Sequence, residues 1–194
     1  NIYVLESPIL SNSQFEKFTK FFGKKSKIID CTFSKDNSLV ESLEKILKES
    51  EIAVRQGTTQ LILTDINISE EKIAIPMLLC VGAINKYLIE KKLRGYVSIN
   101  VQTGEALDTH SFATIIGVGA TTINPYLALD SLYQRYEKKL FGKLNYEECI
   151  ERYIKSINFG LLKIMSKMGI SVLSSYRGGC NFEALGLSRT IVSE

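Results

Sequence analysis

Hydrophobic residues recur along this chain with two alternating spacings. Short, nearly continuous apolar runs predict β-strands, and longer segments in which apolar residues return every third or fourth position predict amphipathic helices. The predicted strands lie at residues 2–5, 27–33, 60–64, 96–101, 121–124 and 170–173. The predicted helices lie between them and end near residues 22, 57, 93, 116, 142 and 169. Strand and helix therefore alternate along the chain.

Helix-capping residues support these boundaries. Ser11 or Ser13 can cap the first helix, Asn145 can cap the last, and Pro76 suits the first turn of a helix. The connections between successive strands are long enough only for parallel pairing. We therefore predict an α/β fold of alternating βα units with a mostly parallel sheet, either an open sheet or, as the closer resemblance, a partial or distorted TIM-type barrel.

The segment from residue 161 to residue 179 combines these elements with polar chemistry. A helical face ends at Gly169, a predicted strand follows, and a polar loop with two glycines comes after the strand. Parallel α/β proteins bind ligands at the carboxyl ends of their strands. Lys167 and Arg177 provide positive charge suited to a phosphate or carboxylate, and Ser171 provides a hydroxyl group. This loop is a candidate anion or cofactor site, and packing of a strand against a helix is the alternative.

Other polar residues also follow predicted strands, and turning the chain is the commoner role of such residues. They are Asp30, Asp65, Gln102 to Glu105, and Asn124. His110, the single histidine, could act as a general acid or base, but its position at a predicted helix start favours a surface or capping neighbour. Glu105 and Asp108 could be paired catalytic carboxylates, or acids that the helix dipole favours at a helix start.

A glycine-containing segment at residues 117–120 resembles the beginning of a dinucleotide-binding GxGxxG fingerprint. Thr122 occupies the place of the last glycine, and the preceding element is a predicted helix rather than a strand. The close approach of backbone to a pyrophosphate at a helix N-terminus is therefore not supported, and we expect a helix end followed by a turn.

Composition narrows the classes of function. The net charge of +3 is small and the lysines are spread among acids, so we expect no nucleic-acid surface. No apolar stretch approaches the length of about 18 residues that suggests a membrane span. The four cysteines are widely separated and form no zinc or iron–sulfur pattern, and three lie among apolar neighbours, as in a reduced cytosolic core. Because the chain begins with Asn1, we expect an internal piece of a longer protein.

The later part of the sequence resembles a known family. The segment LLKIMSKMGISVLSSYRGGCNFEALGLS is similar to the junction of the central and FMN-binding domains in the large (alpha) subunit of glutamate synthase. The resemblance continues in SPIL, in AVRQG followed by LILTD, in IPMLLCVGAINKYLI and in TGEALDTHSFATIIGVGATTINPYLAL. The form SYRGGCNFEALGLSR is more similar to bacterial NADPH-type enzymes than to ferredoxin-dependent ones.

The resemblance implies a division into residues 1–156, the central domain, and residues 157–194, the start of the FMN-binding (β/α) barrel. The family makes two L-glutamate from L-glutamine and 2-oxoglutarate by reductive transfer at FMN, and this piece would link the amidotransferase and synthase sites and be inactive alone. It would hold no catalytic residue and no metal. The positions that match the family's flavin site are Lys167, Met168, Gly169, Ile170 and Ser171, with Arg177 behind them.

Cofactors and partners follow from the same resemblance. FMN and a 3Fe-4S cluster belong to the full-length enzyme, and we expect this piece to bind neither completely. The implied partners are the other domains of the subunit and a small (beta) subunit, with no nucleic acid and no membrane. The implied location is the cytoplasm, or the plastid for the ferredoxin-dependent type. The alternative hypotheses are a small stand-alone flavin- or phosphate-binding α/β protein and an oligomerisation module.

Overall fold

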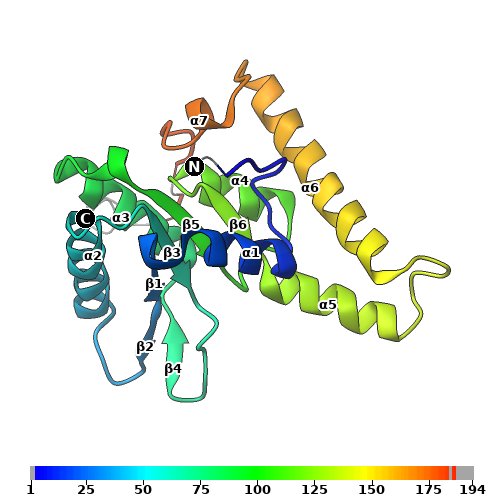
Figure 1. Cartoon of the computed structure of the whole chain (residues 1–194), viewed down its shortest axis with the longest axis horizontal. Helices are drawn as coiled ribbons and strands as arrows, with labels where there is room; N and C mark the ends of the chain where they lie inside the picture. The colour runs from blue at the N-terminus through cyan, green and yellow to red at the C-terminus, as the bar shows by residue number, and fades with distance from the viewer. Residues whose placement is uncertain (1–2, 184, 187–194) are drawn as a thin grey trace.

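A four-stranded parallel sheet forms the centre of the molecule (Figure 1). The computed structural model describes residues 3–183 and 185–186. The strands of the sheet are β1 (Ser26–Asp30), β3 (Gln60–Thr64), β5 (Ser98–Gln102) and β6 (Thr122–Asn124). Beyond β6, Ile9 forms a single parallel bridge to Ile123, so the N-terminal segment continues the sheet.

The strands stand side by side in chain order, β1-β3-β5-β6. Each is parallel to its neighbour, with Ile62 opposite Asn100 and Asn100 opposite Thr122. A sequential order is typical of a (β/α) barrel, whereas doubly wound sheets reverse direction at a switch point. The predicted α/β class is therefore confirmed, and the order favours part of a barrel over an open doubly wound sheet.

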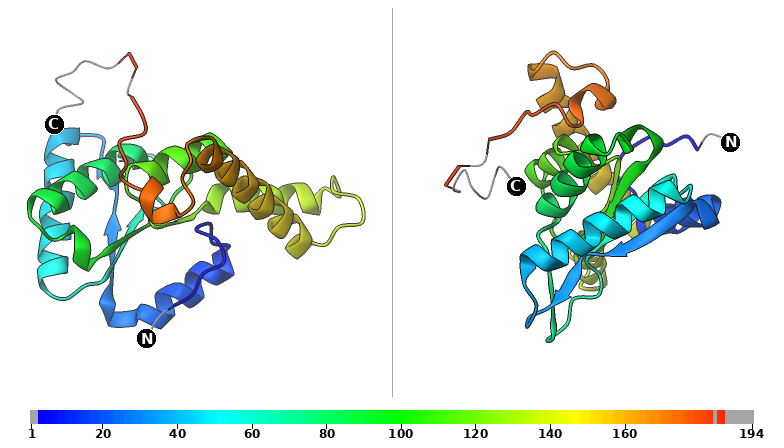
Figure 2. Two further views of the ribbon diagram at one scale, coloured as in Figure 1. Left: turned by 90° about the horizontal axis from the view of Figure 1, so that it is seen from above. Right: turned by 90° about the vertical axis from the view of Figure 1, so that its left-hand side faces the viewer.

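The helices pack beside the sheet and on one another. α2 contacts α3, α3 contacts α4, and α4 contacts the long α6, which also contacts α5 (Figure 2). The helices are α1 (Asn12–Phe22), α2 (Leu39–Arg55), α3 (Met77–Glu90), α4 (Thr109–Gly117), α5 (Tyr126–Glu137), α6 (Tyr146–Lys167) and α7 (Leu173–Tyr176), with short 3₁₀ turns η1 (Gly23–Lys25) and η2 (Arg94–Tyr96). Ser11 and Asn145 cap α1 and α6 with full capping boxes, as their positions predicted.

The two faces of the sheet differ in character. One face is apolar and is buried with residues of α2, α3 and α4 in the main core; its strand residues are Ile29, Leu61, Leu63, Ile99, Val101 and Ile123. On the opposite face Ile62 packs with Phe15 and Phe18 of α1. On the β5 and β6 side of Ile62 this face is polar: the Thr122 hydroxyl donates to Asn100 Oδ1 at 2.8 Å. Asn100 is fully buried, and its amide in turn donates to Leu61 O at 3.2 Å, so this polar face is hydrogen-bonded internally.

Two strands form a separate antiparallel ribbon. β2 (Thr32–Ser34) pairs with β4 (Lys72–Ala74), and the ribbon extends away from the sheet (Figure 1). The single strand predicted at 27–33 is therefore divided at Cys31, whose N–H donates to Thr64 O and whose O accepts from Ile75 N–H. β4 was not predicted, because its three residues lie beside a run of acids and carry too short a pattern.

Two predicted strands do not form. Residues 3–5 have no regular structure, and the pairing is made further along, where Leu10 N–H donates to Ile123 O at 2.9 Å. The strand predicted at 170–173 is also wrong: residues 170–172 are irregular, and α7 begins at Leu173. The N-terminal segment occupies the edge beside β6, and the Ile170 N–H is used to close the end of α6 on Met165 O. Residues 170–172 are therefore used to end α6 and to lead into α7 rather than to extend the sheet.

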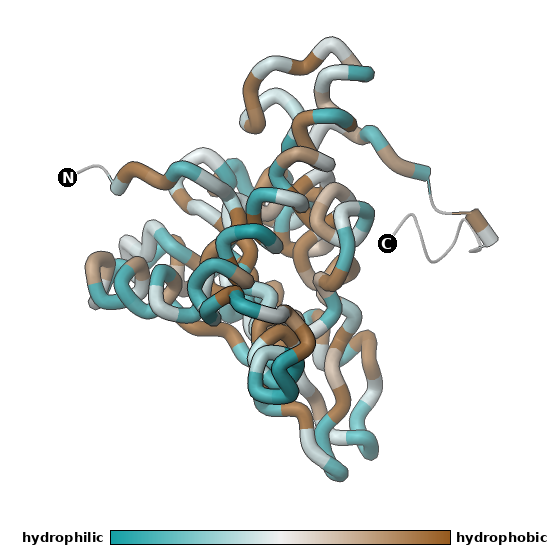
Figure 3. The backbone as a smooth tube through the Cα atoms, turned by 90° about the vertical axis from the view of Figure 1, so that its right-hand side faces the viewer, coloured by the Kyte–Doolittle hydropathy of each residue, from teal (hydrophilic) through white to brown (hydrophobic). Residues whose placement is uncertain are grey.

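α6 packs closely on α4 and leaves other surfaces exposed. A Cβ at Gly160 would lie 2.5 Å from the Thr109 side chain, so glycine permits the close approach of the two helices. Figure 3, which colours the backbone by hydropathy, shows hydrophobic and hydrophilic residues interspersed along the chain. Phe159 and Leu162 of α6 are 71% and 63% exposed. In the part of the chain that the structure describes, no helix combines the length and apolarity needed to cross a membrane.

Candidate functional site

Asp65 is the centre of a polar cluster at the carboxyl edge of the sheet. It follows β3 directly, and only 1% of the residue is exposed. Its carboxylate accepts the Thr103 hydroxyl and, at 3.1 Å and 3.2 Å, the Gly104 N–H, both from the loop after β5. Because β3 and β5 are parallel neighbours, their carboxyl ends meet, and the structure brings these predicted polar residues together.

Glu105 and Tyr126 lie beside this carboxylate. Burial, followed by the charge of Asp65 and a hydrogen bond with it, raises the pKa of Tyr126 to about 12. Partial burial of its carboxyl group, together with the charge of Asp65, raises the pKa of Glu105, although a hydrogen bond from the Met77 N–H acts in the opposite direction. Tyr126 was not singled out in the sequence; the available signal was its place immediately after a strand and proline.

Both acids of the 105–108 loop cap helices. Glu105 Oε2 accepts the first N–H of α3, from Met77, at 2.9 Å. Asp108 is the N-cap of α4 and accepts the Ser111 N–H at 2.9 Å and its hydroxyl at 2.6 Å, hydrogen bonds that lower the pKa of Asp108. The helix-start interpretation is therefore confirmed for Asp108, whereas Glu105 caps the start of α3, a helix earlier in the chain. In each acid, one carboxylate oxygen accepts these hydrogen bonds.

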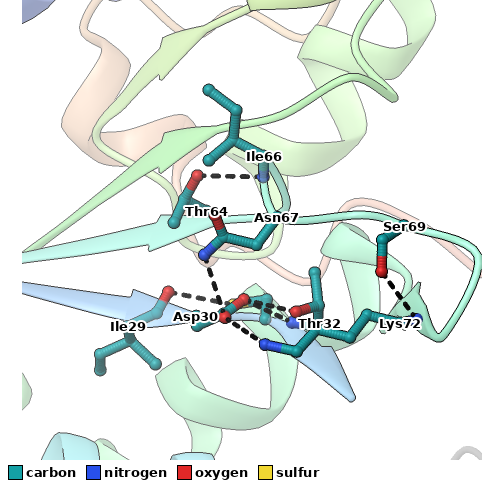
Figure 4. A network of polar contacts seen from close by, with 9 residues as sticks. Ile29, Asp30, Thr32, Thr64, Ile66, Asn67, Ser69 and Lys72 are labelled. Atoms are coloured by element: carbon teal, nitrogen blue, oxygen red, sulfur yellow. Dashed lines mark hydrogen bonds and ion pairs between the residues drawn. The ribbon is translucent and has the colours of Figure 1, made fainter. Parts of the chain in front are cut away.

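Asp30, at the end of β1, holds a second polar network (Figure 4). Its Oδ1 accepts the Thr32 N–H at 3.0 Å and the Thr32 hydroxyl at 2.7 Å, and its Oδ2 accepts the Asn67 amide at 3.0 Å and lies 3.8 Å from Lys72 Nζ. Partial burial opposes ionisation, but the hydrogen bonds from Thr32 and Asn67 and the charge of Lys72 lower the pKa of Asp30 overall. The network joins the sheet to the β2–β4 ribbon.

Gln102 and Asn124 complete the carboxyl edge. The Thr64 hydroxyl donates to Gln102 Oε1 at 2.9 Å, and the Gln102 amide donates to Asn124 Oδ1 at 3.3 Å. The Asn124 amide then reaches Leu10 O at 3.0 Å. These side chains tie the strands and the N-terminal segment together. His110 is exposed, and among the described residues it belongs to no group of three potential metal ligands.

The five positions expected to approach a flavin lie at the end of α6. Lys167 is its last residue, and Met168 and Gly169 follow it at the surface. Gly169 has a φ of +69°, and a Cβ there would meet nothing within 4 Å. Ile170 is half-buried against the main core, whereas Ser171 is exposed. The segment thus lies at the surface, with the exposed Lys167 side chain and open space beside the Gly169 backbone.

Arg177 lies elsewhere, at the amino edge of the sheet. Its Nη1 donates at 2.8 Å to the hydroxyl of Thr121, the residue before β6. The sequence had placed this arginine in a loop at the carboxyl end of a strand, and that placement is wrong because no strand forms at 170–173. Arg94 approaches the same edge and was missed by the sequence reasoning, since an arginine before a predicted strand carries no distinctive signal.

The cysteines do not form a ligand set. Cys31, Cys80 and Cys149 are free and buried, as predicted for core residues, and Cys180 is free and exposed. A hydrogen bond between the thiols of Cys31 and Cys80, together with burial, raises the pKa of Cys31, which keeps that thiol protonated. Such an arrangement fits packing and does not fit thiolate ligation of a 3Fe-4S cluster.

Comparison with known proteins shows to which family the chain belongs. The model of the glutamate synthase central domain matches residues 1–188. The chain belongs to the glutamate synthase central domain family. It is 49% identical over 193 residues to the large chain of a glutamate synthase [NADPH] from Azospirillum brasilense and 44% identical over 192 residues to that of Bacillus subtilis. It is 40% identical over 203 residues to a chloroplastic ferredoxin-dependent glutamate synthase of Oryza sativa subsp. japonica.

These relatives of the central domain are much longer than the chain. The alignments cover 97–98% of this chain but only 12–13% of the relatives. The identities are higher to the two bacterial NADPH-type large chains than to the rice protein, as the form of residues 175–189 predicted.

Solved structures are similar to this central domain in fold. A flavocytochrome b2 variant with benzoylformate aligns with a TM-score of 0.54 and 12% identity, over 93% of this chain and 42% of that chain. DHODH from Eimeria tenella in complex with ferulenol aligns with a TM-score of 0.50 and 17% identity, over 80% of this chain and 38% of that chain. At such identities the likeness shows the fold alone, and the coverage agrees with a partial barrel.

Proposed function

We propose that the chain is the central part of a glutamate synthase large chain and links its glutamine-hydrolysing and synthase parts. The observation that carries the proposal is the family match over residues 1–188, together with alignments that cover nearly all of this chain and about an eighth of each relative. The match does not favour a stand-alone flavin- or phosphate-binding protein.

The whole enzyme would make two L-glutamate from L-glutamine and 2-oxoglutarate. NADPH is the electron source that the higher identities to the two bacterial relatives support, and FMN, when bound, would supply the reducing equivalents at the synthase site. Residues 167–171 would form one wall of the flavin site, for which the exposed Lys167 and the open backbone at Gly169 are suited. Arg177 would act on that wall only indirectly, since it is bonded to Thr121.

The domain division and the partners belong to the same proposal. Residues 1–156 would be the central domain, and residues 157–194 would begin the FMN-binding barrel, with the division inside the continuous helix α6. The 3Fe-4S cluster would be held by cysteines outside this chain. The partners would be the other domains of the large chain and a small (beta) subunit, and the location of an NADPH-type enzyme would be the cytoplasm.

The linking role has support in the structural use of the acids at the carboxyl edge of the sheet. The acids of the carboxyl edge are engaged as helix caps and loop anchors, as shown for Glu105 and Asp108. Side chains used in this way hold a framework in position, whereas a catalytic acid or base needs a free position beside its substrate. The chain would therefore support neighbouring sites and help to wall the path of ammonia between them.

The test uses the purified chain and the Azospirillum brasilense enzyme as a positive control. Glutamate formation is measured from 2-oxoglutarate with either glutamine or ammonium, in the presence of FMN and a reductant. We expect no turnover by the chain alone and no binding of FMN at micromolar concentrations. Turnover above the enzyme-free rate would refute the linking role, and retention of yellow FMN would favour the stand-alone flavoprotein.

A second experiment tests the link directly. The corresponding segment of the Azospirillum brasilense large chain is replaced by this chain, and the chimera is compared with the parent enzyme. We expect glutamine-dependent glutamate formation to be retained, because the two segments are 49% identical over 193 residues. The chimera could instead fold, contain FMN and hydrolyse glutamine without forming glutamate from 2-oxoglutarate. That result would contradict the proposal that this chain links the two sites.

A further inference from the structure

Two arginines meet at the amino edge of the sheet, opposite to the Asp65 cluster. Arg94, in η2, and Arg177, just after α7, line one hollow of about 320 Å³. The other lining residues come from the starts of β3 and β5 and the turns before them, and they include the hydroxyl-bearing Thr59 and Ser98. The two arginines are half-buried and are separated by 83 positions in the sequence, so only the fold brings them together.

The Arg94 guanidinium is held firmly in place. Its Nε donates to Asn85 Oδ1 at 2.7 Å, its Nη2 donates to Gly119 O at 2.9 Å, and its Nη1 donates to Val97 O. A guanidinium has five N–H donors in one plane, so two remain after these bonds. The group is thus oriented before any ligand arrives.

The Arg177 guanidinium has more free donors. Within residues 3–183 and 185–186 it has one hydrogen-bond acceptor, the Thr121 hydroxyl. Thr121 lies two residues after Gly119, which binds Arg94, so one short segment before β6 holds both cations. Four N–H groups of Arg177 remain for another acceptor.

The pair lacks a counter-charge in the described part of the chain. The ion pairs there all involve other residues, and no carboxylate lies within salt-bridge distance of either guanidinium. Burial, followed by the charge of Arg177, lowers the pKa of Arg94 to about 10, and burial lowers the pKa of Arg177. Two partly buried like charges repel each other, and an anion between them would relieve that repulsion.

We propose that Arg94 and Arg177 form a binding site for an oxyanion, either a phosphate group or a carboxylate. The planar donor forks of two arginines match the oxygens of both groups, and the Thr59 and Ser98 hydroxyls at the rim of the hollow can add further donors. The site is independent of the proposed linking function, because it lies at the sheet edge opposite to the Asp65 cluster and uses none of the residues 167–171.

The test is a titration of the ¹⁵N-labelled chain with sodium phosphate and, separately, with sodium glutarate, at constant ionic strength. The arginine Nε–Hε signals are followed by NMR. We expect saturable shifts of two arginine signals, with a dissociation constant on the order of 1 mM or lower for at least one probe. Tighter binding of phosphate would indicate a free phosphate ligand, and tighter binding of glutarate would indicate an acidic side chain as the natural occupant.

Variants of Arg177 separate a specific site from general charge. Arg177→Gln should weaken binding at least tenfold, and Arg177→Lys should weaken it less, because charge is kept but the donor fork is lost. Arg152→Gln, which removes an exposed arginine on α6, is the control and should leave binding unchanged. The amide spectrum of each variant reports whether it is folded. The absence of saturable shifts up to about 50 mM of either probe, or equal binding by folded Arg177→Gln, would overturn the proposal.

Discussion

Substitution of Asp65 by asparagine tests whether the carboxyl edge depends on one buried charge. Asparagine has nearly the same size, so no cavity arises and the change is confined to hydrogen bonding. The native carboxylate accepts the Thr103 hydroxyl and the Gly104 N–H. The asparagine of the variant has only one side-chain oxygen, so its NH₂ group must face one of these two donors.

The magnitude follows from those two hydrogen bonds. Hydrogen bonds to a charged group contribute about 1.5–3 kcal/mol each, and asparagine can retain one neutral bond of about 1 kcal/mol, so the expected loss is about 2–5 kcal/mol. For a chain of this length, each lost kcal/mol lowers the melting temperature by about 2–4 °C. Urea unfolding followed by circular dichroism at pH 7 measures the loss. The matched control is Asp36→Asn, an exposed acid, for which the change should stay within about 0.5 kcal/mol.

Two outcomes would refute this reasoning. If the free energy of unfolding of Asp65→Asn lay within about 0.5 kcal/mol of the native value, the hydrogen bonds of Thr103 and Gly104 would not depend on a charged acceptor. An equal loss in Asp36→Asn would show that the effect comes from net charge rather than from the hydrogen bonds of Asp65. The Gly104 amide signal should also move in Asp65→Asn, since its N–H loses a charged acceptor.

Two further substitutions test backbone conformation and pH dependence. Gly119 has a φ of +135°, and a Cβ there would lie 2.6 Å from Asn85, so Gly119→Ala should cost more than about 2 kcal/mol in urea unfolding, whereas Gly95→Ala, with open space, should cost far less. The raised pKa of Glu105 means that its contribution to stability is present below the unfolded value of 4.5 and is lost as pH rises through the folded value. Relative to Glu105→Gln, the native chain should therefore be more stable at pH 4 than at pH 7, and a gap that is constant or of opposite sign would contradict the shift.

The sequence predicted the fold where local signals suffice. Each α-helix longer than four residues coincides with a predicted one, and the Asn145 cap was identified from residue type and position alone. Asp65 and Thr103 were expected at one edge because parallel strands bring their carboxyl ends together. Such inferences need only the hydrophobic period and the direction of neighbouring strands.

The rest depended on contacts between distant residues. Residues 170–172 do not form a strand; the Ile170 N–H closes the end of α6 on Met165 O, and the segment around Leu10 lies at the edge beside β6. Arg94 donates a hydrogen bond to Gly119 O, 25 positions later in the chain, and the residues next to Arg94 in the sequence do not indicate this partner. The end of α6 at residues 165–170 and the meeting of two arginines are properties of the folded chain that periodicity does not encode.

The two edges of the sheet therefore differ in what they can still bind. In parallel α/β proteins the carboxyl edge is the usual place for ligands, yet here its acids accept hydrogen bonds from helix starts and loops, as Glu105 does at α3. The amino edge, usually the stabilising side of a barrel, instead holds two cations with unused donors, Arg94 and Arg177.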